Sequence, residues 1–172
     1  AGRLEEVAVT LGMDVPFFLL GGAALATGRG ERLTPLAGSA LALVLVNPRI
    51  AASTAEVYGR VTPAMYSDGS RTRALVAALQ SRRPTRIAAS LYNGLEAAVV
   101  PVYPQVGQME AALLAAGALG AAMSGSGPTV FGVARSWEHA RLIQRRVARG
   151  SWECWAVRTL RGPAVRVRNG PS

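Results

Sequence analysis

Residues 119–134 read LGAAMSGSGPTVFGVA, two apolar segments joined by a short run of glycine and serine. Short apolar runs that end at a turn are typical of buried strands, so we predict strands at 119–124 and 128–134. Glycine and serine are ordinary residues of a β-hairpin turn. The same residues, Ser124–Gly127, could also direct successive backbone N–H groups at one anion, because glycine tolerates positive φ. A plain turn and a phosphate-binding loop are both consistent with this segment.

The segments on either side of this hairpin extend the pattern to four strands. Leu41–Val46 is a continuous apolar run that ends at Asn47-Pro48, as expected of a buried strand, and 152–160 is predicted to be the last strand. Helices are predicted at 54–61, 71–80, 84–97, 104–116 and 137–149. Without the extra helices, residues 41–160 follow the order β-α-β-β-α-β, which is the ferredoxin-like pattern. We therefore predict an α+β fold.

Residues 1–38 do not belong to that pattern. Leu4, Val7, Ala8 and Leu11 have helical spacing. Asp14-Val15-Pro16 fits the start of a second helix, with Asp14 at or near the N-cap. We predict that 1–38 are the C-terminal remnant of another domain, that 39–160 form a second domain, and that 161–172 are a flexible tail.

Composition narrows the possible functions. Half of the 172 residues are hydrophobic, enough for a sizeable core, but no apolar run approaches the length of a membrane span. All nineteen basic residues are arginine, which excludes a mechanism that needs a lysine from this chain. The arginines are scattered without interleaved aromatics, so we expect a phosphorylated ligand and neither a nucleic-acid nor a membrane partner. The single cysteine, Cys154, excludes an internal disulfide and favours a cytoplasmic location.

A few polar residues are candidates for chemistry. Asp14 is one of two aspartates; its carboxylate could accept the proton of an attacking hydroxyl, although a plain N-cap also explains it. Tyr58 lies one helical turn beyond Thr54, where its ring could stack on a base or simply pack against the helix's neighbours. For Asn93-Gly94-Leu95-Glu96 we prefer a helix kink or a polar anchor. The only histidine, His139, is expected to be a solvated helix residue.

Taken together, these segments resemble one kinase family. The run Leu11–Gly22, followed by Ala24–Glu31, resembles the middle of the 4-diphosphocytidyl-2-C-methyl-D-erythritol kinase family, which belongs to the GHMP kinase superfamily. Further similar segments follow in the same order over nearly the whole chain: Asn47-Pro48, Ser53–Tyr58, Asn93–Glu96, Tyr103–Val106 and Met123–Gly127.

The resemblance implies an activity and roles for particular residues. The family transfers the γ-phosphate of ATP to the 2-hydroxyl of a cytidine-diphosphate-linked methylerythritol in non-mevalonate isoprenoid biosynthesis. By resemblance, Asp14 is catalytic and Tyr58 stacks on cytosine beside Thr54. The residues that line the site near the transferring phosphate are then Ser124, Gly125, Ser126 and Gly127. Mg²⁺ is expected to accompany ATP, although no metal ligand is identifiable in this chain. The implied fold is the end of a ribosomal-S5-like N-terminal domain followed by a ferredoxin-like GHMP kinase C-terminal domain.

The sequence also departs from the family pattern. The family's ATP-phosphate loop, and the lysine that accompanies its aspartate, are not found between Ala1 and Ser172. We therefore expect a C-terminal fragment that is inactive alone and that works with an N-terminal kinase half. Two alternatives are a ferredoxin-like module that binds a nucleotide or a partner without chemistry, and another small-alcohol kinase of the GHMP superfamily.

Overall fold

A computed structural model describes residues 2–148 and 151–162 of the chain. The described residues form two compact units: residues 2–40 with 159–162, and residues 41–148 with 151–158. The domain boundaries proposed from the sequence stay predictions. Most of the predicted tail, residues 163–172, and the predicted helix end at 149 lie outside the described residues. Among the described residues, no helix is both long enough and apolar enough to cross a membrane.

The smaller unit contains two helices and a hairpin. Helix α1 (Gly2–Leu11) and helix α2 (Val15–Leu20) precede strands β1 (Ala23–Thr27) and β2 (Arg32–Leu36), which pair antiparallel. Positive φ at Gly28 and Gly30 allows the tight turn between the strands. Near the other end of the chain, Thr159 joins this unit because its hydroxyl donates to the carbonyl of Ser39 at 3.1 Å.

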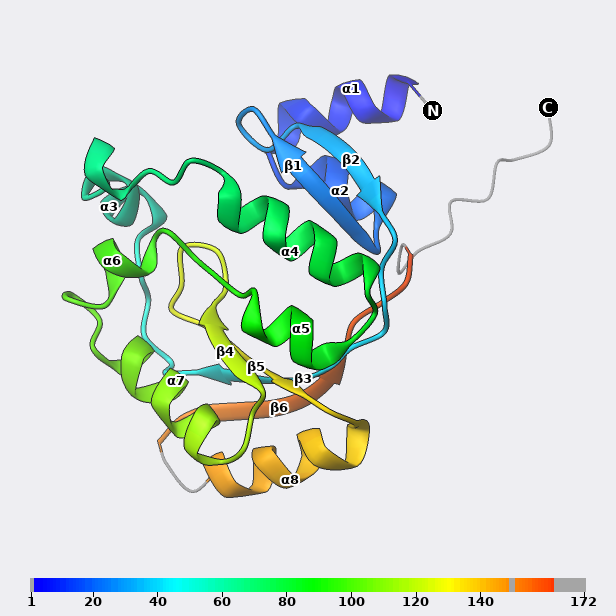
Figure 1. The fold of residues 1–172 in the computed structure, drawn as a ribbon. Coiled ribbons are helices and arrows are strands. Elements are labelled where there is room, and N and C mark those ends of the chain that lie inside the picture. The colour runs from blue at the N-terminus through cyan, green and yellow to red at the C-terminus, as the bar shows by residue number, and fades with distance from the viewer. Residues whose placement is uncertain (1, 149–150, 163–172) are drawn as a thin grey trace. The chain divides into compact units, whose positions relative to one another are not determined.

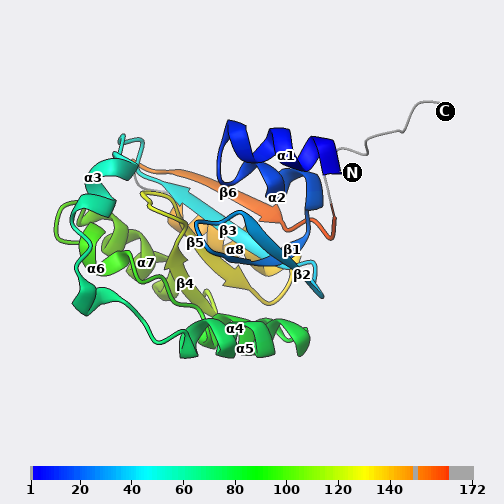
Figure 2. The ribbon, with the colours of Figure 1, turned by 90° about the horizontal axis from the view of Figure 1, so that it is seen from above.

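The larger unit is built on a four-stranded antiparallel sheet. Its strands are β3 (Ala42–Asn47), β4 (Gly120–Met123), β5 (Val130–Ala134) and β6 (Glu153–Arg158), in the spatial order β4-β5-β3-β6. Figure 2 shows these strands side by side. Helices occupy the connection from β3 to β4, and one helix joins β5 to β6, so the chain follows the predicted β-α-β-β-α-β order.

The first connection contains most of the helices. These are α3 (Thr54–Gly59), a 3₁₀ turn (Pro63–Met65), α4 (Ser70–Gln80), α5 (Pro84–Ala89), α6 (Glu96–Val99) and α7 (Gln105–Ala115). The continuous helix predicted over 84–97 is wrong, because residues 90–95 separate α5 from α6. Local side-chain bonds replace helical ones there: Ser90 Oγ donates to the carbonyl of Arg86, and Asn93 Oδ1 accepts the amide of Leu95.

The core lies between the sheet and helices α7 and α8 (Trp137–Val147). Alternation along β3 buries Val44 and Val46 completely, as expected for a strand with one fully covered face. Ser136 caps α8, its hydroxyl accepting the amide of His139 at 3.2 Å. Figure 1 shows α8 on one side of this sheet and α5 on the other. The result is a rigid platform that holds the turn between β4 and β5.

Candidate active site

The glycine- and serine-rich segment forms the loop between β4 and β5. The amide of Ser124 donates to the carbonyl of Thr129 at 2.8 Å, and the amide of Gly127 donates to the carbonyl of Ser124 at 3.0 Å. Gly125 and Gly127 have φ of 57° and 81°, which side chains rarely adopt. A Cβ on Gly127 would also lie 2.7 Å from the sulfur of Met123. The turn predicted from the sequence is therefore present, and its shape requires glycine.

Two residues of the first connection hold the start of this loop. Asn93 Nδ2 donates to the carbonyls of Met123 and Gly125, at 2.9 and 2.8 Å. The carboxylate of Glu96 accepts the amide of Met123 at 2.8 Å. The segment predicted as a kink or polar anchor is thus an anchor for the loop. The sequence predicted this anchor only in part, because Met123, to which Asn93 donates, lies 30 residues further along the chain.

Two further contacts tie the loop to the end of β3 and the start of α3. The hydroxyls of Thr54 and Ser126 are 3.0 Å apart and share a hydrogen bond. Asn47 Nδ2 donates to the hydroxyl of Thr129 at 2.8 Å. The structure therefore brings Thr54, a predicted substrate-binding residue, directly against the predicted phosphate-proximal loop.

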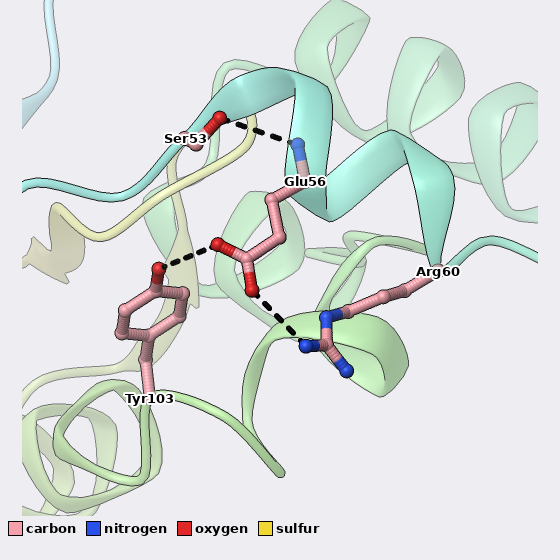
Figure 3. A network of polar contacts seen from close by, with 4 residues as sticks. All are labelled: Ser53, Glu56, Arg60 and Tyr103. Carbon is pink, nitrogen blue, oxygen red and sulfur yellow. Dashed lines mark hydrogen bonds and ion pairs between the residues drawn. The ribbon is translucent and has the colours of Figure 1, made fainter.

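Helix α3 is itself fixed by Glu56, as Figure 3 shows. The Glu56 amide donates to the hydroxyl of its N-cap Ser53 at 3.3 Å, and the Glu56 carboxylate pairs with Arg60 at 3.0 Å. The hydroxyl of Tyr103, just before α7, donates to the same carboxylate at 3.4 Å. Two segments that the sequence analysis singled out separately, 53–58 and 103–106, therefore meet at Glu56. This network ties α3, the helix that contains Tyr58, to the segment just before α7.

Tyr58 is 60% exposed and lines a hollow of about 480 Å³. A second hollow, of about 390 Å³, reaches the loop at Met123 and Gly125 and includes Asn93 in its lining. The two hollows share three lining residues: Met65, Ser67 and Gly94. One surface therefore runs from an exposed aromatic ring to a loop of small residues.

Asp14 belongs to the smaller unit, with residues 1–40. It occupies the N-cap position of α2, as predicted, but its side chain makes no capping hydrogen bond and is exposed. It lines a hollow of about 280 Å³ together with Phe17, Phe18 and Gly30. A structural capping role therefore does not explain this carboxylate, and its catalytic role stays a prediction.

Among the described residues, no cluster of three or more His, Cys, Asp and Glu side chains could hold a metal ion. Burial raises the pKa of the Cys154 thiol to about 11, so this cysteine is a poor nucleophile. Desolvation, followed by the charges of Arg135 and Arg146, lowers the pKa of His139, which contacts Arg135 rather than the loop.

Comparison with known proteins finds similar kinases. Residues 75–153 match the GHMP kinases C terminal family. The chain is 46% identical over 157 residues to the 4-diphosphocytidyl-2-C-methyl-D-erythritol kinase of Pelotomaculum thermopropionicum, covering 91% of this chain and 55% of that protein. It is 46% identical over 147 residues to the corresponding kinase of Gloeobacter violaceus, covering 82% and 49%.

A solved structure of such a kinase is similar to this chain in fold. The crystal structure of a 4-(cytidine 5'-diphospho)-2C-methyl-D-erythritol kinase superposes with a TM-score of 0.78 at 35% identity, covering 90% of this chain and 56% of that one. The chain thus spans about half the length of the relatives it matches.

Proposed function

We propose that this chain, a homologue of the 4-diphosphocytidyl-2-C-methyl-D-erythritol kinases with a GHMP kinase C-terminal domain, contributes to the active site of such a kinase. The reaction transfers the γ-phosphate of ATP to the 2-hydroxyl of 4-(cytidine 5'-diphospho)-2-C-methyl-D-erythritol, in the cytoplasm. Residues 39–160 are then the ferredoxin-like C-terminal domain of the enzyme. Residues 1–38 are then the end of its ribosomal-S5-like N-terminal domain.

The observation that carries the proposal is the hydrogen bond between Thr54 and Ser126. It joins the helix that presents an exposed aromatic ring to the loop of small residues. A cytidine diphosphate ester has a flat base and two phosphates, which need a stacking surface and backbone donors respectively. The shared lining of the two hollows supports a ligand that extends across both.

Each group has a distinct task in this proposal. Asp14 accepts the proton of the attacking hydroxyl and orients its oxygen. Gly125 and Gly127 let the backbone of the Ser124–Gly127 loop approach the transferring phosphate closely, since glycine has no side chain to keep the phosphate away. Mg²⁺ neutralises the ATP phosphates when it is bound, and we assign it no ligand among the described residues.

The first test is binding to the 172-residue chain by calorimetry. We expect cytidine diphosphate to bind and ATP alone to bind more weakly, since the family's ATP-phosphate loop is not found in this sequence. Equal affinity for adenosine and cytidine diphosphates would contradict the substrate assignment. Binding of a different small alcohol in preference would favour another GHMP kinase.

The second test measures ATP-dependent phosphorylation by the complete gene product and by the 172-residue chain in parallel. We expect turnover by the former and none by the latter, because phosphoryl transfer needs a positioned and neutralised triphosphate. In the active form, Asp14→Asn should lower kcat strongly with little change in KM. Binding of cytidine diphosphate without turnover in the complete product would favour the non-enzymatic binding module.

A further inference from the structure

Two carboxyl groups meet beneath the start of the Ser124–Gly127 loop. Glu96 at the start of α6 accepts the amide of Met123 at 2.8 Å. Glu110 on α7 lies close enough to both for its carboxyl to interact with Glu96 and with the Met123 amide. Oε1 of Glu110 is buried, and among the described residues no donor reaches it. A buried oxygen without a donor is unfavourable and calls for an explanation.

A proton between the two groups supplies the missing donor. Ionised carboxylates only accept hydrogen bonds, whereas a protonated carboxyl group donates one. Desolvation, followed by the negative charge of Glu96, raises the pKa of Glu110 from 4.5 to about 7. Like charges at close range force one member of a pair to keep its proton.

The described surroundings contain no cation to balance the pair. Neither carboxylate has an ion-pair partner among the described residues. Of the elements packed against α7, strands β4 and β5 contain no ionisable side chain. The nearby charged groups have other contacts or are exposed: Arg146 donates to the carbonyl of Ala116 at the far end of α7, Arg60 and Tyr103 contact Glu56, His139 contacts Arg135, and Glu138, Arg141 and Arg145 are exposed.

We propose that Glu96 and Glu110 share one proton, and that this proton fixes Glu96 as the acceptor that orients the start of the Ser124–Gly127 loop. Both are positioning residues, since they act on the loop and not on a ligand. When the proton leaves to solvent, two adjacent negative charges remain, and a carboxylate that moves away relieves their repulsion. The hydrogen bond of 2.8 Å between the Met123 amide and Glu96 is then weakened. Only the assignment of this loop to phosphate binding rests on the proposed function.

The test compares the wild-type 172-residue chain with Glu110→Gln, whose amide donates to Glu96 at every pH. Because the pKa of Glu110 is raised in the folded state, its contribution to stability is fully present below about pH 4.5 and is lost as pH rises to about 7. Between about pH 5.5 and 8.5 we expect the wild-type melting midpoint to fall by about 2–4 °C relative to Glu110→Gln, about half the value for a fully buried group, because Glu110 is only partly buried. His139 titrates in both proteins, so its effect cancels in the difference.

Glu138→Gln is the matched control. Glu138 is exposed, and hydrogen bonds at the start of α8 lower its pKa, so the same substitution there should leave the difference from wild type constant over this pH range. Parallel melting curves for wild type and Glu110→Gln would overturn the proposal.

A second measurement needs no variant. The side-chain carboxyl carbon of Glu110 in the wild-type chain should titrate near 7 by nuclear magnetic resonance. Exchange of the Met123 amide, corrected for its intrinsic pH dependence, should become about tenfold faster as that proton is lost. The shared proton would be refuted if the Glu110 carboxyl titrated near 4.5. It would also be refuted if the protection of the Met123 amide from exchange did not change with pH. Neither measurement involves a nucleotide, so a failure of the kinase proposal leaves both unchanged.

Discussion

Asn93→Asp should destabilise the chain more than its small change in size suggests. The substitution keeps Oδ1, which accepts the amide of Leu95, but places an oxygen where Nδ2 donates to the carbonyls of Met123 and Gly125. Two hydrogen bonds worth about 0.5–1.5 kcal/mol each are lost, and a charged acceptor then faces two carbonyls. We expect the free energy of unfolding to fall by about 2–4 kcal/mol, which lowers the melting midpoint by about 5–12 °C for a chain of this size.

Thermal denaturation followed by circular dichroism measures this loss, with Asn47→Asp as the matched control. Asn47 Nδ2 donates to the hydroxyl of Thr129, and a hydroxyl can turn and donate to a carboxylate, whereas a carbonyl cannot. We therefore expect Asn47→Asp to cost less than about 1 kcal/mol. If the two variants melt within about 1 °C of each other, Asn93 does not hold the loop in the way described.

Three further predictions concern the loop, the aromatic surface and the thiol. Tyr58→Ala should weaken cytidine diphosphate binding by about tenfold with little change in melting, because the ring is exposed. Trp155→Ala removes another exposed ring, one that lines neither hollow, and should leave binding unchanged; equal effects would count against stacking. Gly127→Ala should lower the free energy of unfolding by about 1–3 kcal/mol, because the φ of Gly127 is 81° and an added Cβ has no room. Gly59→Ala, where a Cβ meets open space, should leave that free energy unchanged or raise it; thermal denaturation followed by circular dichroism measures both variants. Cys154, with its pKa raised to about 11, should react with iodoacetamide at pH 8 about a hundredfold more slowly than after unfolding; equal rates would show an accessible thiolate.

Elements with a strong local signal were predicted well from the sequence. The apolar run at 41–46 and the hairpin at 119–134 are strands, and Ser136 caps its helix, because these features depend on neighbours a few residues away. The helix predicted over 84–97 fails for the opposite reason. Asn93 leaves the helix to reach a loop 30 residues further along the chain, and periodicity contains no information about that partner.

In the candidate site, too, local features were predicted from the sequence and contacts between distant residues were not. Thr54 and the Ser124–Gly127 loop were predicted separately, and the structure places Thr54 against Ser126. Glu110 was not predicted at all, since a glutamate at a helical position resembles an ordinary solvated residue. Only the folded chain shows that it lies beside a second carboxyl. Asp14 remains a prediction because its proposed role depends on a substrate and on a second unit.

Every side chain that supports the β4–β5 loop comes from residues 47–96, with Glu110 added in our proposal, and none comes from α8 or β6 among the described residues. Exposed positions of α8, such as Glu138 and Arg141, can therefore diverge without altering the ligand surface, whereas Ala140 and Ile143 belong to the core beneath it. A transplant into a related scaffold would have to carry residues 47–134 together, because Tyr103 and Glu110 also contact the groups that hold this surface.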